Sequence, residues 1–472
     1  MKKILIPLLI SAFLLPACVG KNFKKPEVDL PESESKQTSQ ASKTNFEVVE
    51  NEQWWTIFGD NVLNKFEEEA LKYNYDLKSA MAKIQEAKAK LSVSRSNLYP
   101  TISLYGRVAD SKSNRKMHYD IGSDSGRFFA GVTASYEIDL WGKYWRTSES
   151  SKADFLSSKA DYDAIRLTLT ATVAEAYFQY MAYASEFEIT KITLKSREES
   201  YNVYSKKFKK GVINELDLRR VEAEMESVRA QVYNAEQSLK QTENALSVLL
   251  GRSPKNMIEG SLDKGNKIDD STKIPKIPMS VPSDLISRRP DIKAAEYTLK
   301  SYNAKIGAAK AYLFPSIYLT GDAGYASYEL EDLFKEENDT WSYSGEISWE
   351  IFSGGKNKKT YQAQKAQYDQ ALASYNKTVQ TAFKEVLNAI NNYSLGEKIL
   401  AARQKEVVAM RRSYVLALKR EKAGLIELLD VLDVERFLLE AEEYLVSAKQ
   451  NQLNAVIDIC KALGGGWKEE KK

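Results

Sequence analysis

The most extended regularity in the chain is a seven-residue spacing of large apolar side chains, present in both halves. A period of seven kept over this length is typical of left-handed supercoiled helices. It predicts two very long helices, over about 147–210 and 358–422, each extending about 95 Å at 1.5 Å per residue. The positions are Val173, Tyr180, Phe187, Leu194, Tyr201 and Phe208 in the first half, and Leu372, Val379, Val386, Tyr393, Leu400, Val407 and Tyr414 in the second.

Each heptad segment is followed by a glycine at the point where the chain must reverse. These residues are Gly211 and Gly424, and glycine adopts the left-handed C-cap conformation without the penalty of a Cβ atom. We therefore expect return helices, about half as long as their partners, over about 215–250 and 427–463. Shorter helices that begin near Asn61 and Ser283 are expected to stack end to end with them.

Strict alternation of apolar and polar residues marks four short segments that precede the long helices. They predict two β-hairpins, at about 98–141 and about 313–353, with polar loops at 110–127 and 329–340. One apolar and one polar face over about ten residues is typical of membrane barrel strands. A soluble half-buried sheet would show the same alternation. Four strands are too few to close a barrel, which needs about eight or more, so the membrane interpretation requires several copies of the chain.

The sequence contains an internal repeat that spans most of the chain. Residues Glu137–Lys143 match Glu350–Lys356 at an offset of 213 residues, and Leu98–Pro100 match Leu313–Pro315 at an offset of 215. The two-residue change falls between Pro100 and Gly142, where a loop of different length is expected. The predicted division is a first repeat over 51–251, a Pro-rich connector over 252–282, a second repeat over 283–464 and a tail over 465–472.

The N-terminus has the composition of an export signal. Lys2 and Lys3 precede an apolar run too short to span a bilayer, which predicts a signal peptide over 1–17. Leu15–Cys18 resembles the lipobox of bacterial lipoproteins, so Cys18 is the predicted lipidation site; ordinary secretion with a free Cys18 is the alternative. A polar tether is expected over 18–50. Cys460 then has no disulfide partner.

Composition removes several classes of function. The 68 basic and 65 acidic residues nearly balance, which argues against a nucleic-acid surface. His118 is the single histidine, and this excludes most histidine-based metal and acid–base chemistry. The sequence contains no Walker loop, zinc motif or Gly-x-Ser-x-Gly elbow. We expect no enzyme activity and no cofactor.

Several motifs together resemble one family, the TolC/OprM-type outer-membrane efflux lipoproteins, the outlet subunits of tripartite multidrug pumps. Besides the signal and lipobox they are Trp54-Trp55 with Phe58 and Asp60, Arg289–Ile292, Phe314–Ser316, Glu137–Lys143, Leu429–Asp433 and Lys461–Trp467. The resemblance implies a mainly α protein in a Gram-negative outer membrane, a homotrimer with a shared twelve-stranded β-barrel and a long coiled-coil α-helical periplasmic barrel. It implies a periplasmic adaptor and an inner-membrane resistance-nodulation-division transporter as partners, and passive export of drugs and toxic compounds.

The resemblance also places a channel gate at Asp430 and Asp433. Their spacing puts both carboxylates on one helix face, and threefold symmetry would gather six near the axis, which favours cations and resists full ionisation. Alternatively, acids in the first turns of a helix only complement its dipole. In the first copy Asp217 matches Asp430, while Arg220 replaces the second acid and would either pair with an aspartate or be an exposed charge.

Two further expectations concern the helix tips. The family's Tyr and Arg gate latch is not matched, because Glu421 and Ile426 occupy those positions. The turns around Gly211 and Gly424 are the expected adaptor contacts. Two rival functions are a protein-exporting type I secretion duct of the same fold and a surface-anchored coiled-coil fibre. The fibre would need no amphipathic hairpins.

Overall fold

The computed structural model describes residues 19–26, 53–110, 127–259, 267–269, 272–277 and 288–465. The chain divides into two compact units. The described residues of the sheet unit come from Met1–Val28, Lys83–Lys159 and Ala294–Asn376, and those of the tip unit from Asp29–Ala82, Ala160–Lys293 and Lys377–Lys472. Each unit therefore draws on both copies of the repeat.

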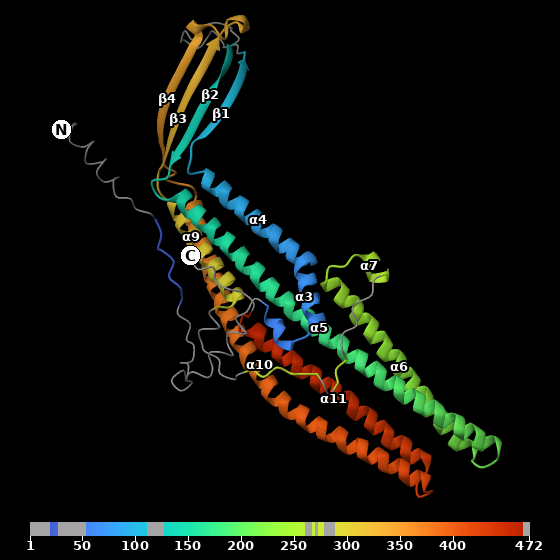
Figure 1. The fold of residues 1–472 in the computed structure, drawn as a ribbon. Helices are drawn as coiled ribbons and strands as arrows, with labels where there is room; N and C mark the ends of the chain where they lie inside the picture. The colour runs from blue at the N-terminus through green and yellow to red at the C-terminus, as the bar shows by residue number, and fades with distance from the viewer. Residues whose placement is uncertain are drawn as a thin grey trace. The chain divides into compact units, whose positions relative to one another are not determined.

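The sheet unit contains one antiparallel sheet in the order β1-β2-β3-β4. The strands are β1 (Thr101–Ala109), β2 (Arg127–Ile138), β3 (Ser316–Ser327) and β4 (Asp339–Ser348). Both predicted hairpins are confirmed, and β2 also pairs with β3, so the two copies join in a single sheet (Figure 1). Strand β2 is shorter than the alternation suggested, because it ends at Ile138 and Leu140 lies in the turn before the next helix.

The strand register aligns the apolar positions of all four strands. One cross-strand row contains Leu104, Val132, Ala323 and Trp341, and the next contains Ile102, Ala134, Gly321 and Tyr343. The rows between them are polar, for example Ser103, Thr133, Asp322 and Ser342. The apolar face is uncovered in the single chain, with Leu104 84% and Tyr343 81% exposed. A one-residue slip at any pairing would have mixed the two faces.

Two glycines allow the copies to meet closely. Gly131 of β2 is paired with Gly324 of β3. A Cβ atom at Gly324 would lie 2.3 Å from the carbonyl oxygen of Ala130, and one at Gly131 would lie 2.7 Å from that of Ala323. A side chain at either position would push β2 and β3 apart.

Two residues at the strand–helix junction of the first copy have structural roles that the second copy does not repeat, because Phe352 and Gly354 stand at the positions equivalent to Asp139 and Trp141. Asp139 accepts hydrogen bonds from the backbone N–H groups of Tyr144 (3.1 Å) and Trp145 (2.8 Å) and so caps helix α5 (Lys143–Lys209). Trp141 donates its indole N–H to the carbonyl of Pro315 at 2.7 Å and stacks on Phe314. The motif over 137–143 thus connects the first hairpin to the base of the second.

The tip unit is built from the long helices and their return partners. Helix α6 (Glu215–Leu249) follows α5, and α11 (Leu428–Ala462) follows α10 (Lys356–Lys422). These bounds confirm the predicted helices to within a few residues. The heptad positions Val173, Val379, Val386, Tyr393 and Val407 are buried. Among the described residues, none of the helices is both long and apolar enough to cross a membrane.

The helix expected to begin near Asn61 is in fact two helices. Helix α3 (Asn61–Tyr73) stops at Asn74, whose backbone is not helical (φ −56°, ψ 135°), and a new helix, α4 (Tyr75–Ser96), begins after it. The Asn74 side-chain oxygen accepts from the N–H groups of Asp76 (2.8 Å) and Leu77 (3.1 Å). Asparagine at this position is a strong N-cap, which explains the break. In the second copy the described helix is α9 (Pro290–Ala311), and Ser283 lies outside the described residues.

End-to-end stacking occurs in both copies through different residues, and in the first copy its partner is α4 and not the helix that begins at Asn61. In the first, the Asn74 amide donates to the carbonyl of Leu249 at the end of α6 (2.9 Å). In the second, Arg289 donates to the carbonyl of Ala462 at the end of α11 (3.2 Å) and also pairs with Glu385 of α10. Each return helix therefore ends against the start of a shorter helix, and its last carbonyls find a partner.

The main core of the tip unit surrounds the segment that opens the first repeat. The 3₁₀ helix η1 (Trp54–Phe58) buries both tryptophans, and Trp54 donates to the hydroxyl of Thr170 at 3.1 Å. Asp60 caps α3 and accepts a 2.8 Å hydrogen bond from the Tyr177 hydroxyl. Cys460 is a fully buried free thiol in the same core. The short helix α7 (Pro254–Glu259) begins the connector.

Several sequence predictions fall outside the described residues. These are the signal peptide over 1–17, Cys18, most of the tether and much of the connector, together with the loop over 111–126 and the tail beyond 465. The second hairpin loop is described and contains two short 3₁₀ turns, Leu330–Asp332 and Glu336–Asn338.

One buried carboxyl in α3 has no counter-charge. Glu67 is fully buried, and neither of its oxygens is hydrogen-bonded within the described part of the chain. Burial raises the pKa of Glu67 well above its usual range. The folded state therefore keeps a proton that the unfolded state releases above its ordinary pKa, and the free energy of unfolding falls as the pH rises through this interval.

We expect Glu67→Gln to stabilise the protein at about pH 8 by at least about 1 kcal/mol, and the gain to shrink toward about pH 5. The amide has the shape of the protonated acid and has no charge to desolvate. Thermal unfolding of the purified protein at both pH values measures the effect. The exposed neighbour Glu68 supplies the control Glu68→Gln; equal gains at the two pH values would contradict the assignment.

Candidate functional site

The two helix reversals have the same backbone geometry. Gly211 and Gly424 have φ values of 73° and 70°, in the left-handed region that was predicted for them. The N–H of Val212 donates to the carbonyl of Lys207, and that of Leu425 to the carbonyl of Arg420, each at 2.9 Å. This is the six-to-one hydrogen bond of a Schellman cap. A Cβ atom on either glycine would meet nothing within 4 Å, so backbone conformation alone favours glycine here.

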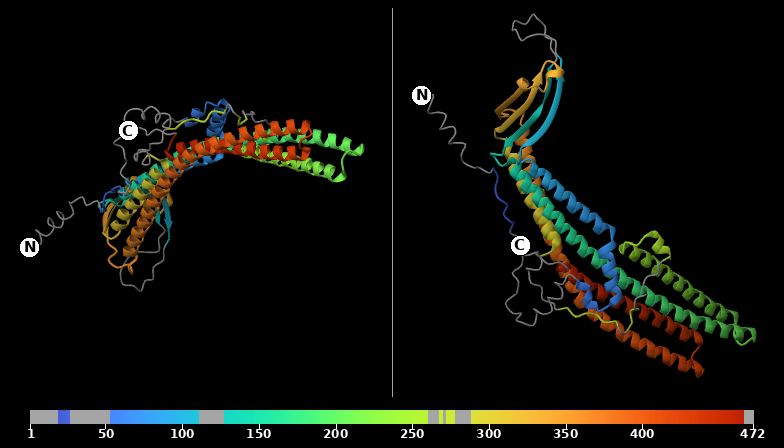
Figure 2. Two further views of the ribbon diagram at one scale, coloured as in Figure 1. Left: turned by 90° about the horizontal axis from the view of Figure 1, so that it is seen from below. Right: turned by 45° about the horizontal axis from the view of Figure 1, so that its top comes forward.

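Both tips combine basic and acidic residues in a fixed order. The last turn of α5 contains Lys206, Lys207 and Lys209, and the last turn of α10 contains Lys419, Arg420 and Lys422. The first turns that follow are acidic, with Glu215 and Asp217 in α6 and Asp430 in α11. Each set complements the helix dipole next to it. The end of each helix hairpin therefore has a basic turn followed by an acidic one. Figure 2 shows the two hairpins, α5–α6 and α10–α11, that end in these turns.

Asp430 and Asp433 are both exposed near the start of α11. Asp430 belongs to a capping box with Glu427, because its Oδ2 accepts from the Glu427 N–H at 3.0 Å. Asp433 pairs with Arg436 one turn along the same helix, at 3.4 Å. The dipole explanation thus accounts for part of the role of Asp430. Neither local contact removes its aspartate from solvent in the single chain.

The first-copy counterparts lie on α6. Asp217 is partly buried, and its N–H is capped by the side chain of Asn214 at 2.9 Å. Arg220 is exposed and forms no ion pair with any residue that the structure describes. Within one chain, no hydrogen bond or ion pair among the described residues joins Asp217 or Arg220 to Asp430 or Asp433. The geometry fits the exposed-charge alternative for Arg220.

The two tips pack against each other through a small apolar cluster. Tyr204, Leu218 and Val221 of the first copy contact Leu432 of the second, with Leu428 and Leu429 beside them. Leu428, Leu429 and Leu432 flank Asp430 and Asp433 on α11. This cluster fixes where the aspartates lie relative to the first-copy helices.

A buried arginine next to this cluster was missed by the sequence reasoning. Arg197 of α5 is 1% exposed and donates to the carbonyl of Leu432 at 2.8 Å. Its Nε lies 3.4 Å from a carboxylate oxygen of Glu435, whose other oxygen accepts from the hydroxyl of Tyr414 at 3.1 Å. Three helices, α5, α10 and α11, therefore meet at one polar contact. The heptad pattern could have indicated that Arg197 is buried, because it follows the heptad position Leu194 by three residues and so lies at a core position.

Farther from the tips, the α5–α11 seam contains a pair of acids. Gln179 accepts a 2.6 Å hydrogen bond from Gln450 across this seam. Burial, together with repulsion from Glu186 and Glu440, raises the pKa of Glu443 to about 7. Burial also raises the pKa of Glu186. Loss of the proton from Glu443 places a negative charge in a partly buried site beside Glu186 and Glu440, which disfavours this part of the seam.

The sequence and fold match known proteins along most of the chain. Residues 67–252 and 281–465 match the family described as outer membrane efflux protein. A relative named as a probable efflux pump outer membrane protein, TtgC of Pseudomonas putida, is 32% identical, with 100% of this chain and 97% of that protein covered. The cation efflux system protein CusC of Escherichia coli is 30% identical, with 98% and 99% covered.

Solved structures match the same length of chain. The CmeC outer membrane channel of Campylobacter jejuni has a TM-score of 0.87 at 27% identity, covering 97% of this chain and 96% of that one. The open state of the MtrE outer membrane channel of Neisseria gonorrhoeae has a TM-score of 0.82 at 33% identity, covering 95% and 98%. The chain therefore belongs to the outer membrane efflux protein family, as an outer-membrane component of an efflux pump.

Proposed function

We propose that three copies of this chain form a passive exit duct, in which each copy contributes four strands to a closed twelve-stranded sheet. The observation that carries the proposal is the continuous, uncovered apolar face of the sheet, bounded by the outer edges of β1 and β4. Within one chain these edges have no strand partner among the described residues. An unpaired edge is not tolerated in lipid, and pairing β4 with β1 of the next copy removes it.

We infer that the duct exports small molecules. Relatives are named as a toluene efflux pump protein, an antibiotic efflux pump protein and a cation efflux protein. The polar face of the sheet, which includes Ser103, Thr133, Asp322 and Ser342, would line a water-filled passage. No resident cofactor is needed for such transport, because the energy comes from the pump.

A periplasmic adaptor and an inner-membrane transporter of the resistance-nodulation-division class are the partners that we propose. The tips around Gly211 and Gly424 are proposed as the adaptor contacts, because both are exposed and each has a basic turn followed by an acidic one. We also propose that a signal peptide over 1–17 is removed and that Cys18 at the new N-terminus is lipidated. The lipid would anchor a tether over 18–50. The two efflux repeats over 51–251 and 283–464 follow.

The gate is proposed at Asp430 and Asp433. Threefold symmetry would bring six carboxylates together at one level, and such crowding binds cations. We further propose that the contact of Arg197 with Leu432 and Glu435 keeps this end of α11 against α5. It takes the place of the family's Tyr and Arg latch, which this sequence lacks.

The duct itself is tested by two neighbouring substitutions on β1. Leu104→Arg places a charge on the apolar face and is expected to cost about 2–4 kcal/mol in lipid, so the yield of heat-modifiable trimers in outer-membrane fractions should fall. Ser103→Arg places the same charge on the polar face and should leave trimers intact with altered ion selectivity in planar bilayers. Equal tolerance of both changes, or a water-soluble monomer, would exclude the duct.

The gate is tested by replacing both aspartates. Asp430→Ala with Asp433→Ala should raise single-channel conductance in planar bilayers and weaken block by divalent cations, because the ring of negative charge is lost. Asp430 also caps α11, so its replacement alone costs about 1 kcal/mol, and Asp433→Ala serves as the variant without this effect. Traces unchanged from those of the original protein would remove the pair as the gate.

The proposed latch predicts that Arg197→Met increases the open fraction of the channel about tenfold, since a buried charged hydrogen bond contributes about 1.5–3 kcal/mol. The double change Arg197→Met with Glu435→Leu should restore thermal stability, because no buried charge is then left unpaired. Arg219→Met, at an exposed position on α6, is the matched control. An Arg197→Met channel that stays as closed as the original would show that the contact is only structural.

A further inference from the structure

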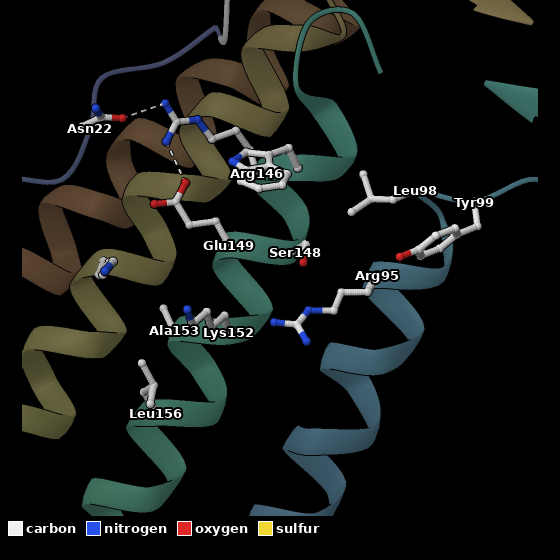
Figure 3. Close-up of a pocket in the computed structure, with 12 residues that line it drawn as sticks. Asn22, Arg95, Leu98, Tyr99, Arg146, Ser148, Glu149, Lys152, Ala153 and Leu156 are labelled. Atoms are coloured by element: carbon white, nitrogen blue, oxygen red, sulfur yellow. Dashed lines mark hydrogen bonds and ion pairs between the residues drawn. The ribbon is translucent and has the colours of Figure 1, made fainter. Parts of the chain in front are cut away.

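A cavity of about 820 Å³ opens between α4 and α5 at the base of the sheet, inside the sheet unit. Figure 3 shows Arg95 reaching from α4 toward α5, with the Tyr99 hydroxyl pointing the same way and Lys152 on the opposite wall. The N-terminal segment contributes Asn22 to the lining, and the other polar lining residues are Trp145, Arg146, Ser148, Glu149 and Lys300. This cavity is separate from the tips and plays no part in the proposed gate.

The lining has an excess of positive charge. Its basic side chains are Arg95, Arg146, Lys152 and Lys300, and its one acid is Glu149. Glu149 is already paired with Arg146 at 2.7 Å. Arg95, Lys152 and Lys300 form no ion pair with any residue in the described part of the chain. Three positive charges around one cavity favour an anionic occupant.

Arg146 is a buried, fixed member of this lining. It is 4% exposed, and its guanidinium donates to the carbonyl of Gly20 at 3.0 Å and to the Asn22 side chain at 3.3 Å. Its stem is so close to Gly307 that a Cβ atom there would lie 3.1 Å from it. The buried Nε has no hydrogen-bond partner within the described residues. Arg146 therefore holds the N-terminal segment at the wall of the cavity through its contacts with Gly20 and Asn22.

The position of the cavity indicates the source of that anion. Tyr99 precedes the first residue of β1 by two positions, and Trp145 follows the last residue of β2 by seven; they are 70% and 60% exposed. Exposed Tyr and Trp at the end of a membrane strand are typical of the lipid–water interface. Asn22 lies four residues after Cys18, so a lipid on Cys18 would be at most about 14 Å away along the chain.

We propose that this cavity binds the phosphate of an anionic phospholipid of the periplasmic leaflet, with Arg95, Lys152 and Lys300 as the charged contacts. The proposal rests on the proposed function, since it requires the sheet to lie in the outer membrane. A phosphatidylglycerol headgroup carries one negative charge and acceptor oxygens on every side of the phosphorus, which suits donors that come from three helices, α4, α5 and α9. The bound lipid would fix the N-terminal segment and the strand–helix junction to the membrane surface.

The test uses the full-length trimer, stripped of lipid in a non-ionic detergent and titrated with phosphatidylglycerol, phosphatidylcholine or inorganic phosphate. Native mass spectrometry counts the bound molecules. We expect preferential binding of phosphatidylglycerol, weakened about tenfold by Arg95→Gln with Lys152→Gln because two charged contacts are lost. The matched control is Lys88→Gln with Lys195→Gln, which removes the same charge from exposed positions of α4 and α5 outside the cavity.

Three results would overturn the proposal. The first is equal affinity for both lipids or an equal effect of the two variants. The second is saturation by inorganic phosphate with no preference among the lipids, which would make free phosphate the ligand. The third is loss of trimers only in the cavity variant, which would show that a second copy of the chain fills the cavity. Conductance in planar bilayers is recorded in parallel, so failure to form channels is recognised as failure of the proposed function instead.

Discussion

The backbone N–H and C=O groups at an open sheet edge find no hydrogen-bond partner in hydrocarbon. The other features of the proposed duct depend on this constraint. The four strands have one continuous apolar face, and the edges of β1 and β4 are open within one chain. In the proposed trimer, closure by further copies would satisfy both edges at once and place the apolar face toward lipid. Symmetry would then repeat every other feature threefold. The two aspartates of each chain would form a ring, and the two helix hairpins of each chain would form a circle of tips.

The duplicated sequence preserves geometry more strictly than side-chain chemistry. Asn74 and Arg289 are equivalent by the offset of 215 residues, and each receives the end of a return helix, one with an amide and the other with a guanidinium. At the tips, Asn214 caps α6 while Glu427 and Asp430 form a capping box on α11. In both copies the helix ends are capped at equivalent places in the fold, and only the side chains that donate or accept the hydrogen bonds differ. This freedom allows the second copy to carry the proposed gate while the first carries Arg220.

The periodicities predicted most of the fold because they reflect packing over many residues. Heptads fixed the long helices, alternation fixed both hairpins, and Gly211 and Gly424 marked the reversals. The features of the fold that these patterns did not predict depend on single residues. The break at Asn74 arises from one cap, and the joining of β2 to β3 depends on Gly131 and Gly324, whose missing side chains give no pattern. The contact of Arg197 with Glu435 links residues 238 positions apart, a distance over which no local rule operates.

The buried ion pair near the proposed gate depends on geometry more steeply than an apolar contact in the same place would. Burial of Arg197 and Glu435 costs solvation free energy that their attraction only partly offsets, so the contact adds little to overall stability. Its dependence on geometry is steep, however, because the hydrogen bond to Leu432 and the pairing with Glu435 are lost together when α11 moves. Solvent then enters and compensates the separated charges. A seam of this kind favours two discrete arrangements over gradual deformation. This property suits the proposed gate, which would open when a partner engages the tips.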